Sequence, residues 1–268
     1  MTPQNMLDAV VSIGIENTEK KPFWIGTGFI VSRVNSANPK QIFFYLITNK
    51  HVVENQTKII IRLNKMSEEL YDDCKILLID DNKKKLYSEH PNESTDVIAC
   101  LIDPITLFND KTVWQAFDLD KQALTLEQMK KEGLQEGSLV YSLGFPMGIV
   151  DIIKTPIFRL GCISRFRDAY FKRNYYPKYY VDAQTFPGNS GGPIINRQEI
   201  TISDGKPKIL SSYLIGILSE YIQYRDELYS SQDGEVRMIL KENSGITVVH
   251  PADRIKEVVE LEFNRAHG

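Results

Sequence analysis

Short apolar runs separated by turn-forming residues make up most of this chain. The runs lie at Phe29–Val31, Ile42–Ile47, Lys58–Leu63, Lys75–Ile79, Val97–Ile102, Ser138–Leu143, Leu210–Leu218 and Ile246–Val249. Their lengths suit β-strands, and the Gly, Pro, Asn and Asp residues between them are typical of turns. Strands at this spacing favour a barrel or sandwich over alternating strands and helices. The sequence therefore predicts an all-β fold.

Two segments have helical patterns instead. Residues 125–131 lie in a polar stretch that we expect to join two β halves. In the tail, Ile255, Val259 and Phe263 recur every four residues among charged positions, which predicts an amphipathic helix packed on the core. The predicted organisation is an N-terminal half over 1–117, a linker over 118–136, a C-terminal half over 137–249 and a helix over 250–268.

Composition and charge exclude several classes of protein. The 268 residues are 42% hydrophobic and 25% charged, which is enough to form a sizeable core. Their net charge of -3 gives no bias toward nucleic acid or an anionic membrane. No apolar run approaches the ~20 residues that cross a bilayer. We expect no nucleic-acid or membrane partner.

The first residues and the cysteines bear on location and cofactors. Met1–Asn5 lacks the basic stretch and apolar core of a secretory signal, so we expect a cytoplasmic protein. Cys74, Cys100 and Cys162 are odd in number and widely spaced, which fits neither a zinc site nor a disulfide framework. No glycine-rich loop opens a helix. We therefore expect no metal and no organic cofactor.

The hexapeptide Gly188–Pro193, GNSGGP, carries the clearest chemical signal. Glycines around a serine allow a tight loop whose backbone N–H groups converge. The N–H groups of Gly188 and Ser190 could then stabilise the oxyanion that forms when the Ser190 hydroxyl attacks a carbonyl. The pattern predicts a nucleophilic serine.

A nucleophilic serine needs a base, and that base needs a carboxylate to orient it. Of the four histidines, His51 directly follows an apolar strand, where a rigid element can hold its imidazole. Asp96 opens another apolar strand. The order His51, Asp96, Ser190 on an all-β chain is a much stronger signal than any one of the three residues alone.

At these positions the chain resembles a known family. The matching segments are Gly26–Val31, Thr48–Val53, Thr95–Ala99, Gly137–Val140, Gly144–Pro146, Asp182–Ala183, Pro187–Pro193, Ile215–Ile217 and Gly245–Pro251. Together they resemble trypsin-like serine proteases of the chymotrypsin fold, and most closely the bacterial HtrA/Deg-type protease domain. The resemblance extends over nearly the whole chain.

The resemblance implies two packed six-stranded antiparallel β-barrels with the active site between them, a C-terminal helix and a bacterial origin. It implies that His51 is the general base, Asp96 its orienting carboxylate and Ser190 the nucleophile. The N–H groups of Gly188 and Ser190 would form the oxyanion hole. The expected activity is that of a serine endopeptidase working through an acyl-enzyme.

Two departures from the family limit what the resemblance implies. HtrA-type proteins usually carry a signal or membrane anchor and PDZ domains, and we expect neither here. Digestive and clotting relatives have an aspartate before the nucleophile, which pairs with a newly cut N-terminus. This chain has the neutral Asn189 there, so we expect no activation by N-terminal cleavage.

The resemblance also points to substrate-binding residues. The residue six before the nucleophile, Gln184, would lie at the base of the S1 pocket. Ser219, Glu220 and Tyr221, after Gly216 and Leu218, would line the pocket and pair with substrate backbone. The uncharged Gln184 argues against a strict preference for Arg or Lys at P1.

The segment Arg165–Tyr180 is rich in aromatic and basic residues. It can be read as a β-hairpin packed on the second barrel. It can also be read as a loop that binds a regulatory protein partner, because Tyr and Arg are frequent recognition residues.

Two other functions remain open. Gly188–Gly192 also fits the G-x-S-x-G elbow of α/β-hydrolases, in which case His250 would be the base of an esterase. That elbow requires a helix directly after the serine, and the two glycines and two isoleucines there favour an extended chain. The chain could also be a catalytically silent binding module on a protease scaffold.

Overall fold

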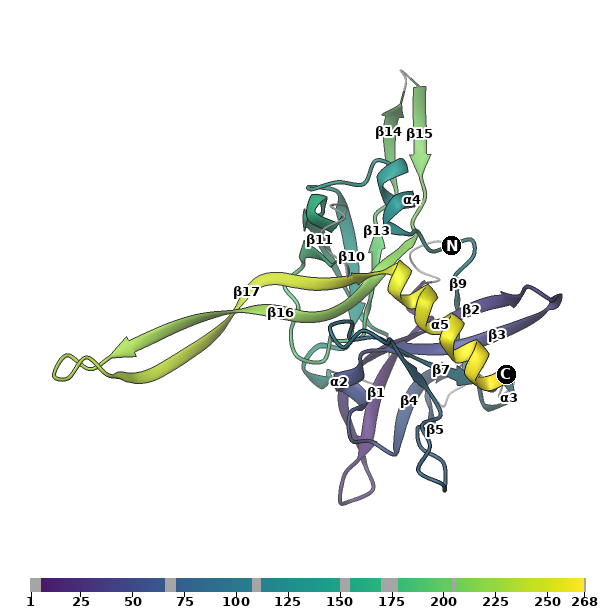
Figure 1. The fold of residues 1–268 in the computed structure, drawn as a ribbon, viewed down its shortest axis with the longest axis horizontal. Helices are drawn as coiled ribbons and strands as arrows, with labels where there is room; N and C mark the ends of the chain where they lie inside the picture. Colours follow the sequence, from purple (N-terminus) through teal and green to yellow (C-terminus); the bar gives the residue numbers. More distant parts are fainter. Residues whose placement is uncertain are drawn as a thin grey trace.

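The computed structural model describes residues 6–65, 71–107, 112–149, 155–169, 178–203 and 206–267. Strands make up most of this part of the chain, as predicted (Figure 1). They form two β halves, and a C-terminal helix lies across them. None of the helices in the described residues is long and apolar enough to span a membrane.

The N-terminal half is a sheet of nine strands in the order β5-β4-β1-β2-β3-β7-β6, with β8 added to β4 and β9 added to β2. The strands are β1 (Val10–Glu16), β2 (Pro22–Asn35), β3 (Asn38–Thr48), β4 (Lys58–Lys65), β5 (Tyr71–Leu77), β6 (Ser88–Glu89), β7 (Ile98–Ile102), β8 (Thr112–Val113) and β9 (Phe117–Asp118). Neighbours along the main order pair antiparallel, and β9 runs parallel to β2.

Among the described residues no ladder closes this sheet, so the six-stranded barrel that the resemblance implied for this half is not shown directly. Its terminal strands, β5 and β6, approach each other only through the segment between them. There the Leu86 N–H donates to the Leu78 carbonyl at 2.8 Å, and Ile79 forms a single bridge with Lys85. Because β6 has only two residues, it does not extend far enough for a ladder to close the sheet within the described residues.

The C-terminal half is a closed barrel of six strands in the order β10-β11-β12-β17-β16-β13, which confirms the prediction for this half. The strands are β10 (Leu139–Gly144), β11 (Ile157–Arg165), β12 (Tyr179–Asp182), β13 (Pro193–Asn196), β16 (Leu214–Tyr229) and β17 (Val236–Pro251). A separate hairpin, β14 (Glu199–Ser203) and β15 (Lys206–Leu210), projects from this half (Figure 1).

Both predicted helices are present. The first, α4 (Leu126–Lys131), begins after Thr125, whose hydroxyl accepts from the Gln128 N–H while the Gln128 side chain accepts from the Thr125 N–H. This reciprocal cap satisfies two backbone donors that the first turn leaves free. The second, α5 (Ala252–His267), follows Pro251 directly. Short helical turns lie at α2 (Lys50–Val53), α3 (Pro104–Leu107), η1 (Pro146–Gly148) and η2 (Arg167–Ala169).

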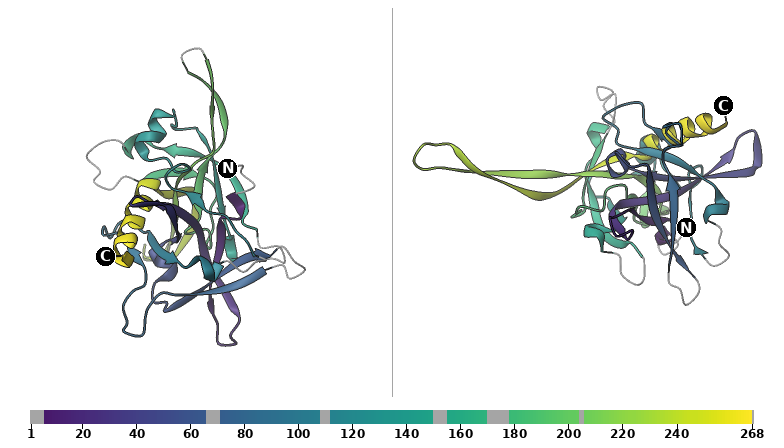
Figure 2. Two further views of the ribbon diagram at one scale, coloured as in Figure 1. Left: turned by 90° about the vertical axis from the view of Figure 1, so that its right-hand side faces the viewer. Right: turned by 90° about the horizontal axis from the view of Figure 1, so that it is seen from below.

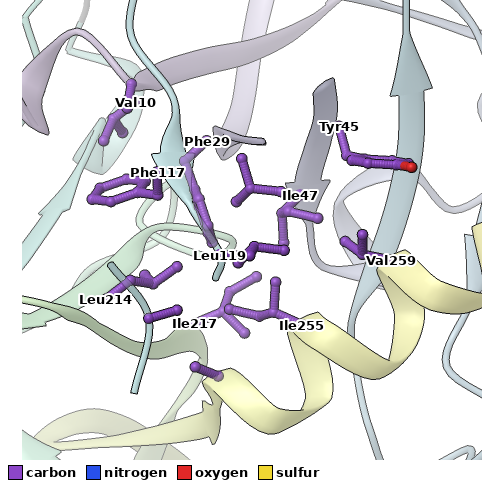
Figure 3. Close-up of a cluster of buried hydrophobic side chains, with 14 of the residues drawn as sticks. Val10, Phe29, Tyr45, Ile47, Phe117, Leu119, Leu214, Ile217, Ile255 and Val259 are labelled. Carbon is purple, nitrogen blue, oxygen red and sulfur yellow. The ribbon is translucent and has the colours of Figure 1, made fainter. Parts of the chain in front are cut away.

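One hydrophobic cluster holds the two halves and α5 together (Figure 3). Phe29 and Ile47 come from the N-terminal sheet, Leu214 and Ile217 from the C-terminal barrel, and Ile255 from α5; all five are fully buried. Burial of an aliphatic or aromatic side chain of this size contributes about 1.5–3 kcal/mol. The relative position of the two halves is therefore fixed by shared packing.

The strands β16 and β17 extend far beyond the barrel. They pair from Gly216↔Pro251 to Tyr229↔Val236, and their outer part forms a twisted ribbon that projects from the body of the molecule (Figures 1 and 2). We call residues 222–243 of this ribbon the arm. The strand runs at Leu210–Leu218 and Ile246–Val249 predicted only the base of this hairpin.

Candidate active site

The three residues predicted to carry the chemistry lie in three separate segments that flank strands. His51 lies on α2, just after β3, and Asp96 lies just before β7. Since β3 and β7 pair with Thr48 opposite Ile98, the two segments are neighbours. Ser190 lies in the loop between β12 and β13 of the other half.

His51 and Asp96 form a close pair. The imidazole Nδ1 lies 2.6 Å from Asp96 Oδ2, and the His51 backbone N–H donates to Oδ1 at 3.2 Å. The hydrogen bond with Asp96 raises the pKa of His51 above its usual 6.5. Burial alone would raise the pKa of Asp96, but the hydrogen bonds and charge of His51 outweigh burial and lower it. The pair thus holds a carboxylate against one nitrogen of a half-exposed imidazole.

Further hydrogen bonds fix Asp96 in place. The Ser219 hydroxyl donates to Asp96 Oδ2 at 3.1 Å, and the Asn49 amide donates to the Asp96 carbonyl at 2.6 Å. The Asp96 backbone N–H donates to Nε2 of His250 at 3.1 Å. Because Nε2 accepts this bond, its imidazole is neutral. Burial, together with the nearby charge of Lys178, lowers the pKa of His250 to about 4.

The loop that carries Ser190 is bonded to both halves of the molecule. The Thr27 N–H donates to the Ser190 carbonyl at 2.9 Å, and the Gly191 N–H donates to the Leu218 carbonyl at 3.0 Å. Gly191 has a φ of +87°, and a Cβ there would lie 2.1 Å from the Thr27 carbonyl oxygen and 2.4 Å from Thr48 Oγ1. Only glycine fits so close an approach. It places the serine loop against Thr48, three residues before His51.

Gly188, on the other side of the serine, has a φ of +98°. Its carbonyl accepts from the Thr27 hydroxyl at 2.6 Å, and that hydroxyl accepts from the Phe145 N–H at 3.0 Å. Among the described residues, the N–H groups of Gly188 and Ser190 have no acceptor. Because Thr27 holds the Gly188 carbonyl, the loop leaves the N–H groups of Gly188 and Ser190 available to bind an oxyanion.

The Ser190 hydroxyl is not hydrogen-bonded to His51 in the described part of the chain. Catalytic hydrogen bonds of this type are often long before substrate binds. The structure brings the His51–Asp96 pair and the serine loop together through Thr48 on one side and Ser219 on the other.

The predicted specificity residues differ in their surroundings within the described part of the chain. Ser219 is buried, and its hydroxyl bonds Asp96, so its side chain supports the carboxylate. Its role in substrate binding stays a prediction. Gln184 has a φ of +41° and lies in a hollow with Arg159, Leu160 and Asp182. Glu220 is exposed and Tyr221 half-buried on β16. The register of β16 slips between Leu218 and Glu220, which turns Ser219 inward.

A hollow of about 460 Å³ adjoins Gly188. Its lining residues are mainly apolar: Pro22, Phe23, Trp24, Ile25, Met147, Gly148, Pro187 and Gly188.

The predicted partner-binding segment Arg165–Tyr180 lies partly outside the described residues, because residues 170–177 are not described. Its role in binding a partner stays a prediction.

His250 does not serve as an exposed base. It is 1% exposed, and its Nε2 is occupied by the Asp96 N–H. The residues after Ser190 continue into the strand β13, not into a helix. Since the nucleophile elbow requires a helix at that point, the esterase alternative is wrong.

The profile of the trypsin-like peptidase domain matches residues 26–200. The chain belongs to this family. The match includes His51, Asp96 and Ser190, and it confirms the family predicted from the sequence.

Two curated relatives of this family member are DegP-like proteins of Pseudomonas. Each is named a "Probable periplasmic serine endoprotease DegP-like", one from Pseudomonas fluorescens at 27% identity and one from Pseudomonas fulva at 25%, both over 172 residues. The aligned part is 64% of this chain but only 27% and 26% of those relatives. Both names place the relatives in the periplasm, which contradicts the predicted cytoplasmic location, so that prediction is wrong.

Solved structures share the fold. The HtrA-type protease AlgW with a tripeptide has a TM-score of 0.52 and 19% identity, covering 96% of this chain and 60% of that one. The MamO protease domain from Magnetospirillum magneticum has a TM-score of 0.51 and 15% identity, covering 94% and 96%. The serine endoprotease from Yersinia pestis has a TM-score of 0.51 and 18% identity, covering 97% and 65%. At these identities the likeness establishes the chymotrypsin-like, HtrA-type fold.

Sequence reasoning missed several residues that support the site. Thr27 lies in the segment Gly26–Val31 and Asn49 in the segment Thr48–Val53, both of which carry the resemblance, but neither received a role. His250 was considered only as an alternative base. A buried histidine before a proline gives no local signal of its bond to Asp96, which is 154 positions away.

Proposed function

We propose that this chain is a serine endopeptidase that hydrolyses peptide bonds through Ser190, His51 and Asp96. The observation that carries the proposal is the His51–Asp96 contact of 2.6 Å on the same side of the molecule as the glycine-bounded serine loop. A carboxylate on Nδ1 holds the imidazole in the tautomer whose Nε2 can accept a proton. The family and its DegP-like relatives support the same activity.

In the proposed first half-reaction, Ser190 Oγ attacks the peptide carbonyl while His51 Nε2 takes its proton. The N–H groups of Gly188 and Ser190 stabilise the oxyanion, an effect typically worth about 3–4 kcal/mol per donor. His51 then gives the proton to the leaving amine, and the acyl-enzyme remains. In the second half-reaction water loses a proton to His51 and attacks the ester, which frees the acid and restores Ser190.

We also propose that the chain is active without cleavage of its N-terminus. Asn189 is 2% exposed, and its Oδ1 has no hydrogen-bond partner among the residues that the structure describes. A neutral amide at this position cannot form an ion pair with a new α-amino group. Intact-mass analysis of active protein tests this point, and activity that appears only after loss of an N-terminal peptide would contradict it.

The endopeptidase is distinguished from a catalytically silent binding module by labelling with a fluorophosphonate. The expected result is one adduct per chain, absent from Ser190→Ala and strongly reduced in His51→Ala. His250→Gln serves as the matched histidine control and should still be labelled. A folded wild-type chain that takes up no label would favour the binding module.

A further inference from the structure

The arm projects away from the body of the molecule and does not pack on the described core (Figures 1 and 2). A two-stranded ribbon without a core beneath it is at best marginally stable in water. Tyr224, Leu228, Met238 and Leu240 are 57%, 48%, 53% and 40% exposed. Leu228 pairs with Met238 and Asp226 with Leu240, so by the alternation of strands these four apolar side chains share one face. An exposed apolar face of this kind marks a binding surface.

One edge of the arm starts at the active site. On that side β16 pairs with β13 only from Leu214 to Ile217. The backbone of Leu218 then exchanges hydrogen bonds with Gly191 and Gly192, the two residues after the nucleophile. Beyond Leu218, no strand among the described residues covers this edge. It runs about 30 Å from Glu220 to Tyr229, at about 3.3 Å per residue.

The other edge of the ribbon, formed by β17, is less suitable for pairing with an extended segment that must reach the serine loop. At its base β17 pairs with β12 through Ile246, and the Asn243 amide donates to the Thr185 carbonyl. An extended segment on β17 would therefore meet residues 184–185 before it reached the serine loop. The β16 edge has no such obstacle in the described structure.

We propose that the β16 edge of the arm is an extended substrate-binding site, onto which a polypeptide adds as a third, antiparallel strand. This inference rests on the proposed endopeptidase function. Because β16 runs from the barrel to the tip of the arm, an antiparallel polypeptide runs from the tip toward the barrel. Its C-terminal end therefore reaches Ser190. The arm then binds residues well upstream of the scissile bond. Every second residue of an edge strand directs its N–H and C=O outward, ready for such pairing.

The side chains of the arm define the class of polypeptide. Apolar residues at alternate positions of the added strand would extend the face of Tyr224, Leu228, Met238 and Leu240. Residues 220–243 contain six acidic and three basic side chains. Asp226 and Glu242 lie on the same face as the four apolar side chains, whereas Arg225, Glu227 and Lys241 lie on the opposite face. The two carboxylates favour a polypeptide with basic residues among the apolar residues of that face, and they disfavour pairing with the arm of a second copy.

The test measures binding to the full chain carrying Ser190→Ala, so that cleavage plays no part. The probe is a fluorescein-labelled 12-residue peptide in which valine and lysine alternate at the odd positions and threonine occupies the even positions. Its binding is followed by fluorescence anisotropy. In the arm-shortened variant, an Asn-Gly turn replaces residues 224–242 and joins Gln223 to Asn243, which already pair. We expect the affinity to fall at least tenfold in this variant. Equal affinity, or no binding to the intact chain, would overturn the proposal.

A second measurement leaves the protein unchanged. In a matched peptide, methyl groups on alternate backbone nitrogens of the first six residues block pairing with the arm only. We expect at least a tenfold loss of affinity, whereas a peptide methylated in this way that binds equally well would overturn the proposal. Sedimentation of the intact and shortened chains tests whether a second copy of this chain binds the arm instead. A dimer that requires the arm would assign this surface to a second copy instead.

The outcome is separable from that of the proposed function. Fluorophosphonate labelling of the wild-type chain reports on Ser190, and peptide anisotropy reports on the arm. Arm-dependent binding without labelling would refute the endopeptidase and keep the binding site. Labelling without arm-dependent binding would refute the binding site and keep the endopeptidase.

Discussion

Protonation of His250 should destabilise the protein in mild acid. The folded chain buries this imidazole in its neutral form, and its Nε2 accepts from the Asp96 N–H. Its pKa is therefore about 4, against 6.5 for an exposed histidine. Between these two values the unfolded chain binds more protons than the folded chain does. The free energy of unfolding must then fall as the pH falls from 6.5 toward 4.

The magnitude follows from the two pKa values. Lowering the pH from 7.5 to 5.0 should remove about 2 kcal/mol of stability through His250 alone. His51 acts in the opposite direction, because its pKa is raised: its pairing with Asp96 stabilises the fold at low pH and loses this effect as the pH rises through the folded pKa. The lowered pKa of Asp96 matters only below 3.8, outside this range.

The assay is urea unfolding at pH 7.5 and 5.0 for the wild type and for His250→Gln. Glutamine retains an acceptor for the Asp96 N–H and does not titrate. Contributions from His51 and other shared groups cancel in the comparison. We expect the wild type to lose about 2 kcal/mol more than the variant on acidification. Equal losses would refute the assignment of His250 as a buried neutral acceptor.

Three further predictions concern the same site. The acid limb of the kcat/KM profile should lie above pH 6.5, because Asp96 raises the pKa of His51 and only the neutral imidazole accepts a proton; a limb below 6.5 would contradict this. Thr27→Val removes the hydroxyl that holds the Gly188 carbonyl and should lower kcat by roughly 10–100-fold with little change in KM, whereas Thr27→Ser should retain activity; equal kcat values in the two variants would exclude this role. Gly191→Ala should destabilise the fold by more than about 3 kcal/mol, whereas the control Gly133→Ala, with a similar φ of +83° and no neighbour within 4 Å, should cost about 1–2 kcal/mol; similar unfolding midpoints would show that the close approach at Gly191 is unimportant.

The sequence predicted the features that depend on local pattern. Strand-length apolar runs identified the all-β class, and the four-residue spacing of Ile255, Val259 and Phe263 identified α5. The order His51, Asp96, Ser190 identified residues that the fold brings to one region. Each of these signals lies within a few neighbouring positions or within a known motif.

Other features depended on contacts that no local pattern encodes. The inward turn of Ser219 results from a slip in the β16–β17 register, which strand alternation cannot anticipate. Within the described residues no ladder joins the end strands β5 and β6 of the N-terminal sheet, so the second barrel that the resemblance implied is not shown directly. The arm escaped notice because residues 222–243 mix charged and apolar side chains and have no core to pack on. The prediction of a cytoplasmic location was wrong because it rested only on the first five residues, which lack the pattern of a secretory signal.

The position of α5 also bears on when the two halves can reach their final relative position. Ile255 and its neighbours complete the apolar layer between the two halves, and this helix is the last element described. During synthesis, Ser190 and His51 leave the ribosome well before that layer can close. We therefore expect the two halves to reach their final relative position only after α5 has been synthesised.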